Sequence, residues 1–130
     1  MIRDKLISRL RECFPDRRAV LGEPPGPVVV YPAEHPEVGD VEIFDHGGEI
    51  TLVAGRFTHG HFSDYGSWSV EESARRIVED VVSFLEDLFA DRVVMWGLHE
   101  GGGGWHGRDA DPAWRVAGPV YVWSGPLAVH

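Results

Sequence analysis

The sequence predicts an α+β fold: a mainly antiparallel sheet of about five to six strands, with an N-terminal helix and one long helix packed on it. Two stretches repeat apolar residues at the helical period, and several short runs rich in β-branched residues lie between glycines and prolines. The chain has 130 residues, of which 43% are hydrophobic and 25% charged. We therefore expect residues 1–130 to form a single domain with its own core.

The two helices are predicted over residues 2–14 and from about Val70 to Phe89. The first has an apolar face that includes Leu6 and Leu10, and Pro15 ends it. Ser69 and Glu72 form the capping-box pattern S-x-x-E at the start of the second helix. A broad apolar stripe along the second helix predicts that it covers the sheet.

Short apolar runs predict strands at residues 28–31, 41–44, 50–53, 56–62, 93–98 and 120–123. The run Asp45-His46-Gly47-Gly48-Glu49 joins two of them and has the glycines that a tight hairpin turn requires. Residues 101–104 are four consecutive glycines, and we expect a loop there.

The formal net charge is −9, although residues 1–18 hold six basic and three acidic residues. A body this acidic repels phosphate backbones, so we expect no nucleic-acid partner. No apolar run approaches the length of a membrane span, so we expect no membrane partner either. The start of the chain lacks a signal-peptide pattern, and Cys13 is the single cysteine, which together favour a cytoplasmic protein. A cationic protein or a metal ion fits this charge.

Four of the seven histidines lie in two short segments, 59–61 and 99–106. Residues two apart in a strand project from one face, so His59 and His61 are placed to bind one metal ion. Asp64 is a further ligand or orients a ligating ring, and His99 and His106 complete the cluster if the glycine-rich loop folds back. Such a nitrogen and oxygen site suits zinc or another divalent transition metal.

The segment from His59 to Asp64 is similar to the H-x-H-x-D-H motif of metallo-β-lactamase-type hydrolases. It departs from that motif in the spacing of the aspartate and lacks the final histidine. We therefore carry neither the fold nor the activity of that family over to this chain.

Contact residues for a partner are expected in the loop-like sequence after residue 104. Trp105, Arg108, Trp114 and Arg115 lie there, and tryptophan and arginine often anchor protein interfaces. No motif assigns a catalytic residue, since the sequence around Ser67 is not the G-x-S-x-G of a nucleophile elbow. These features favour a small acidic binding domain over an enzyme.

In size and charge the chain resembles bacterial immunity proteins that neutralise cationic toxins. This resemblance is one of class, and it implies an inhibitor of a cationic protein. Two alternatives stay open. The first is a metal-dependent enzyme or metal-binding protein that uses His59, His61 and either His99 or His106. The second is a homodimer that pairs through an exposed strand edge.

Overall fold

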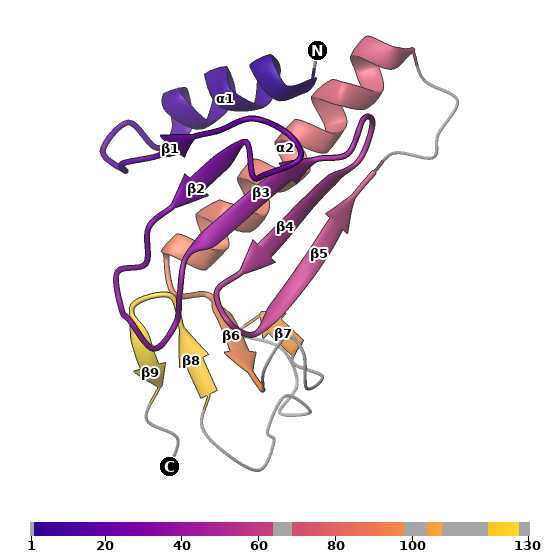
Figure 1. The fold of residues 1–130 in the computed structure, drawn as a ribbon. Helices are drawn as coiled ribbons and strands as arrows, with labels where there is room; N and C mark the ends of the chain where they lie inside the picture. Colours follow the sequence, from indigo (N-terminus) through magenta and orange to yellow (C-terminus); the bar gives the residue numbers. More distant parts are fainter. Residues whose placement is uncertain (1, 64–68, 98–103, 108–119, 128–130) are drawn as a thin grey trace.

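The computed structural model describes residues 2–63, 69–97, 104–107 and 120–127 (Figure 1). The first half consists of α1 (Ile2–Cys13), β1 (Val20–Leu21), β2 (Val29–Tyr31), β3 (Val41–Asp45), β4 (Ile50–Ala54) and β5 (Thr58–Phe62). The second half consists of α2 (Val70–Phe89), β6 (Val93–Trp96), β7 (Gly104–Gly107), β8 (Val120–Val122) and β9 (Gly125–Leu127). The predicted α+β class, with an N-terminal helix and one long helix on a mostly antiparallel sheet, is confirmed.

The five-stranded sheet is a meander in which β1 to β5 follow one another in chain order and pair antiparallel. In Figure 1, α2 runs behind this sheet along its length, and α1 lies at its upper end beside β1. The turn between β3 and β4 is the predicted hairpin, in which Gly47 and Gly48 have φ values of 79° and 137°. One face of the sheet is therefore covered by helices.

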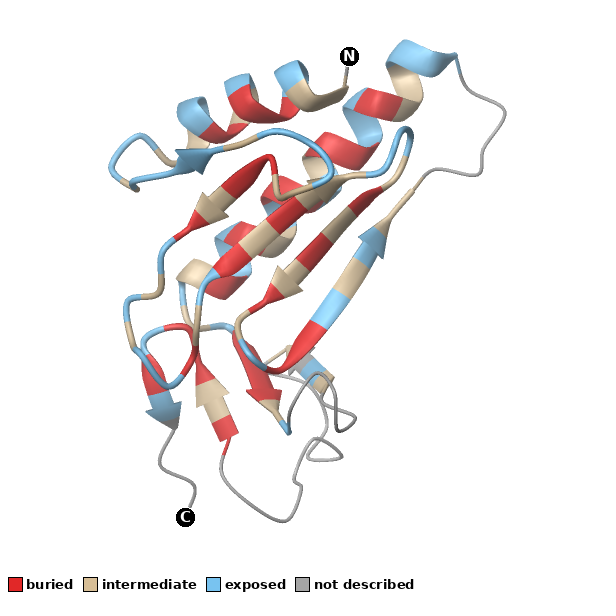
Figure 2. Ribbon diagram, in the orientation of Figure 1, coloured by how far each residue is buried: buried red, intermediate tan, exposed pale blue. Residues whose placement is uncertain are grey.

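The core forms between the covered face of the sheet and the helices. Along β3 and β4, buried residues alternate with half-buried ones, as expected for a sheet with one face against a core (Figure 2). Ile43 and Leu52 are directly paired and are 0% and 1% exposed. The same buried cluster includes Val93 of β6 and Trp123 of the turn between β8 and β9. This main cluster therefore joins both sheets and both helices, and a small second cluster of Val94, Val120 and Val122 lies within the second sheet.

Both ends of α2 are defined by side chains. Ser69 is the N-cap, and its hydroxyl accepts a hydrogen bond of 3.1 Å from the backbone N–H of Glu72, as the capping-box pattern predicts. After the helix, Asp91 adopts a positive φ of 60°. Its carboxylate accepts hydrogen bonds from the Ser124 backbone N–H at 3.0 Å and the Ser124 hydroxyl at 2.6 Å. Asp91 thus ties the end of α2 to the turn between β8 and β9.

The second sheet, with strand order β7-β6-β8-β9, was not predicted as a separate sheet. The expectation of a loop at Gly104 and Trp105 is wrong, because both residues belong to β7 and pair with β6. Glycine has weak strand propensity, but here the tertiary contact decides. A Cβ at Gly104 would lie 2.7 Å from the Trp96 ring, so only glycine lets that ring lie against the neighbouring strand.

Neither helix in the described part of the chain is both long and apolar enough to cross a membrane.

Leu85 provides a test of this core, because it lies on the buried stripe of α2 with 0% exposure. Replacing it by alanine removes buried methyl groups and leaves a cavity, so Leu85→Ala should lower the free energy of unfolding by about 2–5 kcal/mol. Urea unfolding measures this loss. Ser83→Ala on the exposed side of α2 is the control and should change stability by less than about 0.5 kcal/mol. Equal effects of both substitutions would contradict the burial of this face.

Candidate functional site

The face of the five-stranded sheet turned away from the helices is the candidate site. We call it the open face. The register places its side chains in two rows: Val30, Glu42, Val53 and His59 form one, and Phe44, Thr51 and His61 form the other. These residues alternate with the buried positions of the same strands, and the two histidines are the exposed members. No helix or strand of the described residues lies over this face (Figure 1).

The open face is acidic. Strands β1 to β5 contain no lysine or arginine. Glu42 lies in the centre of the face, and Glu49 lies at its end, where the chain enters β4. Its remaining positions are apolar or uncharged, including the half-buried Val53 and Phe44. The arrangement therefore combines apolar contact area with carboxylates.

His59 and His61 lie together on β5, as the H-x-H spacing predicts. Their ring centroids are 5.1 Å apart, at an interplanar angle of 79°. The Nδ1 atom of His61 lies 2.9 Å from Oε1 of Glu49 and 3.1 Å from the hydroxyl oxygen of Thr51. A carboxylate only accepts hydrogen bonds, so Nδ1 of His61 carries the hydrogen. In a neutral ring this leaves Nε2 with a lone pair for another ligand.

The other predicted metal ligands are placed only in part. Asp64 and His99 lie outside the described residues, and His106 is on β7 with its side chain outside the description. Within the described part of the chain, no three or more His, Cys, Asp or Glu side chains gather so as to hold a metal ion. The structure thus brings His59 and His61 together and leaves further ligands as a prediction.

Trp105 is the predicted contact residue that the structure describes. It is 42% exposed on β7, and its ring meets that of Phe84 on α2 edge-on, at a centroid distance of 5.1 Å. Phe84 in turn lies 6.1 Å from Phe62 at the end of β5. Because Phe62 pairs with the buried Ile50, this aromatic row lies on the helix side of β5, opposite the histidines. Arg108, Trp114 and Arg115 lie outside the described residues.

Sequence reasoning missed Glu42, Phe44 and Val53 as members of the site. The sequence did contain a signal for them, because each of the three alternates with buried residues in a predicted strand. The alternation alone does not show which face of the sheet the helices cover.

Comparison with protein-family models, curated proteins and solved structures finds no match to this chain. The candidate site therefore rests on its own geometry.

The contact between His61 and Glu49 predicts an uncommon tautomer. At a pH where the ring is neutral, His61 should carry its hydrogen on Nδ1, because Glu49 accepts from that atom. Long-range nitrogen–proton NMR correlations distinguish the two tautomers. In Glu49→Gln the population of the Nδ1–H form should fall, while that of the exposed His46 should not change. A His61 ring protonated only on Nε2 in the wild-type protein would contradict the contact.

Proposed function

We propose that this protein is a binding domain for a cationic protein, and that the partner docks on the open face. The observation that carries the proposal is the pairing of Glu42 and Glu49 with half-buried apolar side chains on strands that have no lysine or arginine. Exposed apolar area favours association, and carboxylates of one sign select a basic partner and speed its approach.

The size of the face indicates how far the contact extends. Four inter-strand spacings of about 4.8 Å and five-residue strands at about 3.4 Å per residue give roughly 19 by 17 Å. A stable interface covers about 800 Å² on each partner. The partner therefore reaches past the strands. The β5 edge is the direction we propose, because the exposed His59 and His61 lie along it.

Inhibition of the partner is part of this proposal. The acidic composition, the small size and the open face support a protein of the immunity type, which neutralises a cationic protein by covering it. β5 also leaves one edge without a strand partner among the described residues, so a homodimer through that edge is the competing arrangement. Sedimentation of the isolated protein separates the two. A dimer that resists high salt would favour the edge.

A charge reversal on the open face tests the proposal. Wild-type protein, Glu42→Lys and Glu86→Lys serve as baits for cationic proteins, and the Kd of each captured protein is then measured at several salt concentrations. The two variants have the same net charge, and Glu86 lies on the exposed side of α2. Glu42→Lys should weaken binding at least about tenfold, because it places like charges opposite each other.

Binding to the wild type should also weaken steeply as salt increases. Three outcomes would contradict the proposal: equal weakening in both variants, no weakening in either, or no cationic protein retained by the wild type. Equal weakening would indicate that only the overall charge matters.

Metal binding is the second candidate function, and the pair of histidines on one face is the observation that favours it. Centroids 5.1 Å apart suit two rings that share one metal ion. The Glu49 carboxylate at Nδ1 orients the His61 ring, as carboxylates do beside metal-ligating histidines. Zinc and other divalent transition metals accept such nitrogen ligands, and further ligands are expected from Asp64, His99 or His106.

If the metal site exists, zinc, nickel or manganese should raise the melting temperature of metal-stripped wild-type protein. His59→Ala should abolish that rise and leave the stability of the metal-free protein nearly unchanged, since the ring is exposed. His46→Ala is the matched control, because it removes an exposed histidine from the β3–β4 turn. Equal responses of wild type and His59→Ala to metal would refute the site.

A further inference from the structure

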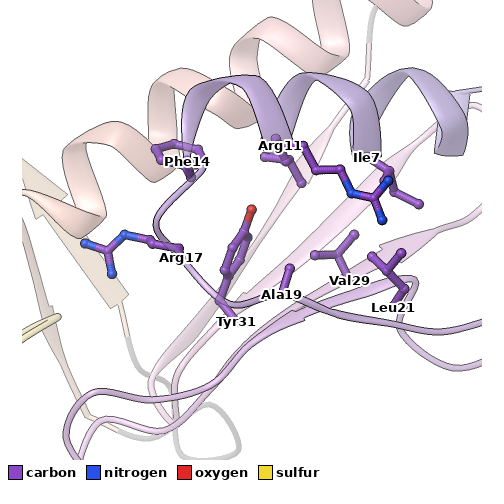
Figure 3. A pocket seen from close by; sticks show the side chains of 9 residues that line it. Ile7, Arg11, Phe14, Arg17, Ala19, Leu21, Val29 and Tyr31 are labelled. Carbon is purple, nitrogen blue, oxygen red and sulfur yellow. The ribbon is translucent and has the colours of Figure 1, made fainter.

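A separate pocket lies on the helix side of the sheet, between the second half of α1 and strands β1 and β2 (Figure 3). Its volume is about 120 Å³. The lining residues are Ile7, Leu10, Arg11 and Phe14 of α1, Arg17 and Ala19 of the connection, and Leu21, Val29 and Tyr31 of the strands. Most of the wall is apolar, and the polar groups are two guanidinium groups and one phenol hydroxyl.

The Tyr31 hydroxyl points into this pocket. Figure 3 shows it directed toward α1, between Phe14 and Arg11. Tyr31 is 3% exposed. Its ring contacts those of Phe14 and Phe89 edge-on, with ring centroids 6.3 and 5.2 Å from its own. The hydroxyl makes no hydrogen bond with any described residue. The hydroxyl is not among the buried atoms that lack a partner, so it stays accessible through the pocket. A group that enters the pocket can therefore accept its hydrogen.

The protonation state of this hydroxyl makes it a donor. Burial raises the pKa of Tyr31 to about 12. The positive charge of Arg17 lowers this pKa, but by a smaller amount. The phenol therefore keeps its hydrogen at neutral pH and offers it to an acceptor in the pocket. A carboxylate oxygen is such an acceptor.

Arg11 supplies a positive charge at the same pocket. Arg17 is engaged elsewhere: it pairs with Glu34 at 2.8 Å and lies 3.9 Å over the centroid of the Phe89 ring. Arg11 makes no ion pair with any described residue, although the chain has 21 acidic residues. Figure 3 shows its guanidinium extending along the same pocket toward Ile7, so it adds positive charge to the wall that an anionic group would meet.

We propose that this pocket binds a small monocarboxylate with a compact apolar body, such as a simple aromatic acid or a short branched acid. The apolar part lies against Leu10, Phe14 and Val29. The carboxylate accepts the hydrogen of the Tyr31 hydroxyl and pairs with Arg11. The pocket, at about 120 Å³, is a little smaller than a cavity of about 150 Å³ that takes benzene, so one ring or a branched chain of a few carbons fills it.

The test uses benzoate and isovalerate as probes, and benzyl alcohol as a neutral analogue of the aromatic acid. Binding is followed by NMR shifts of the pocket residues and by calorimetry. Both acids should bind the wild-type protein, and benzyl alcohol should bind at least about tenfold more weakly than benzoate. Tyr31→Phe and Arg11→Gln should each weaken acid binding at least about tenfold.

The matched control is Arg18→Gln, because Arg18 is an exposed arginine that makes no ion pair among the described residues and does not line the pocket. It should bind both acids as the wild type does. Tyr31→Phe keeps the ring and removes only the hydroxyl, so its melting temperature should stay the same or rise. That combination of lost binding and retained stability separates a ligand-binding role from a structural one.

Ala19→Phe gives a second, independent variant, since Ala19 is exposed at the pocket and a larger side chain there should block entry and abolish binding. It replaces Tyr31→Phe if that variant does not fold. The proposal is overturned if neither acid shifts the pocket signals at about 10 mM, if benzyl alcohol binds as well as benzoate, or if Arg18→Gln weakens binding as much as Arg11→Gln.

Discussion

The apolar stripe of α2 packs against one face of the five-stranded sheet. This contact determines which sheet residues are buried and which face outward. Ile43 and Leu52 face the helices, so their neighbours Glu42 and Val53 must face outward. A slip of one residue between strands would exchange the two sets and bury the carboxylate. Burying the charge of Glu42 would be costly, so the shifted register is disfavoured. The register that remains is the one that forms the open face.

Three of the twelve basic residues tie separate parts of the chain together. Arg9 on α1 donates to both carboxylate oxygens of Glu79 on α2, at 3.0 and 3.1 Å, and this raises the pKa of Arg9. Arg3 and Arg17 join α1 and the chain after it to Glu23 and Glu34. These cations lie on the helix side of the molecule. The excess of acid on the open face and Arg11 at the pocket, which has no ion pair among the described residues, are thus two results of one distribution of charge.

Much of the fold could be predicted because local signals and tertiary structure agree. The Ser69 cap and the stripe of α2 are local features, and so are the glycines between β3 and β4. Strand β7 could not be predicted, since Gly104–Gly107 becomes a strand only by pairing with β6. In the candidate site, the shared face of His59 and His61 follows from strand periodicity. Their neighbour Glu49 and the pocket at Tyr31 depend on which elements pack together, which periodicity does not encode.

The bond between Asp91 and Ser124 joins residues 33 positions apart and has a consequence for synthesis on the ribosome. Both helices and the whole meander lie within residues 2–89, so they emerge before any of the second sheet. Trp123, which is 1% exposed in the finished core, emerges last among the core residues that the structure describes. The part of the chain made first therefore lacks the Trp123 portion of its core until the β8–β9 turn arrives. Until then, we expect chaperones that bind exposed apolar surface to bind the nascent chain.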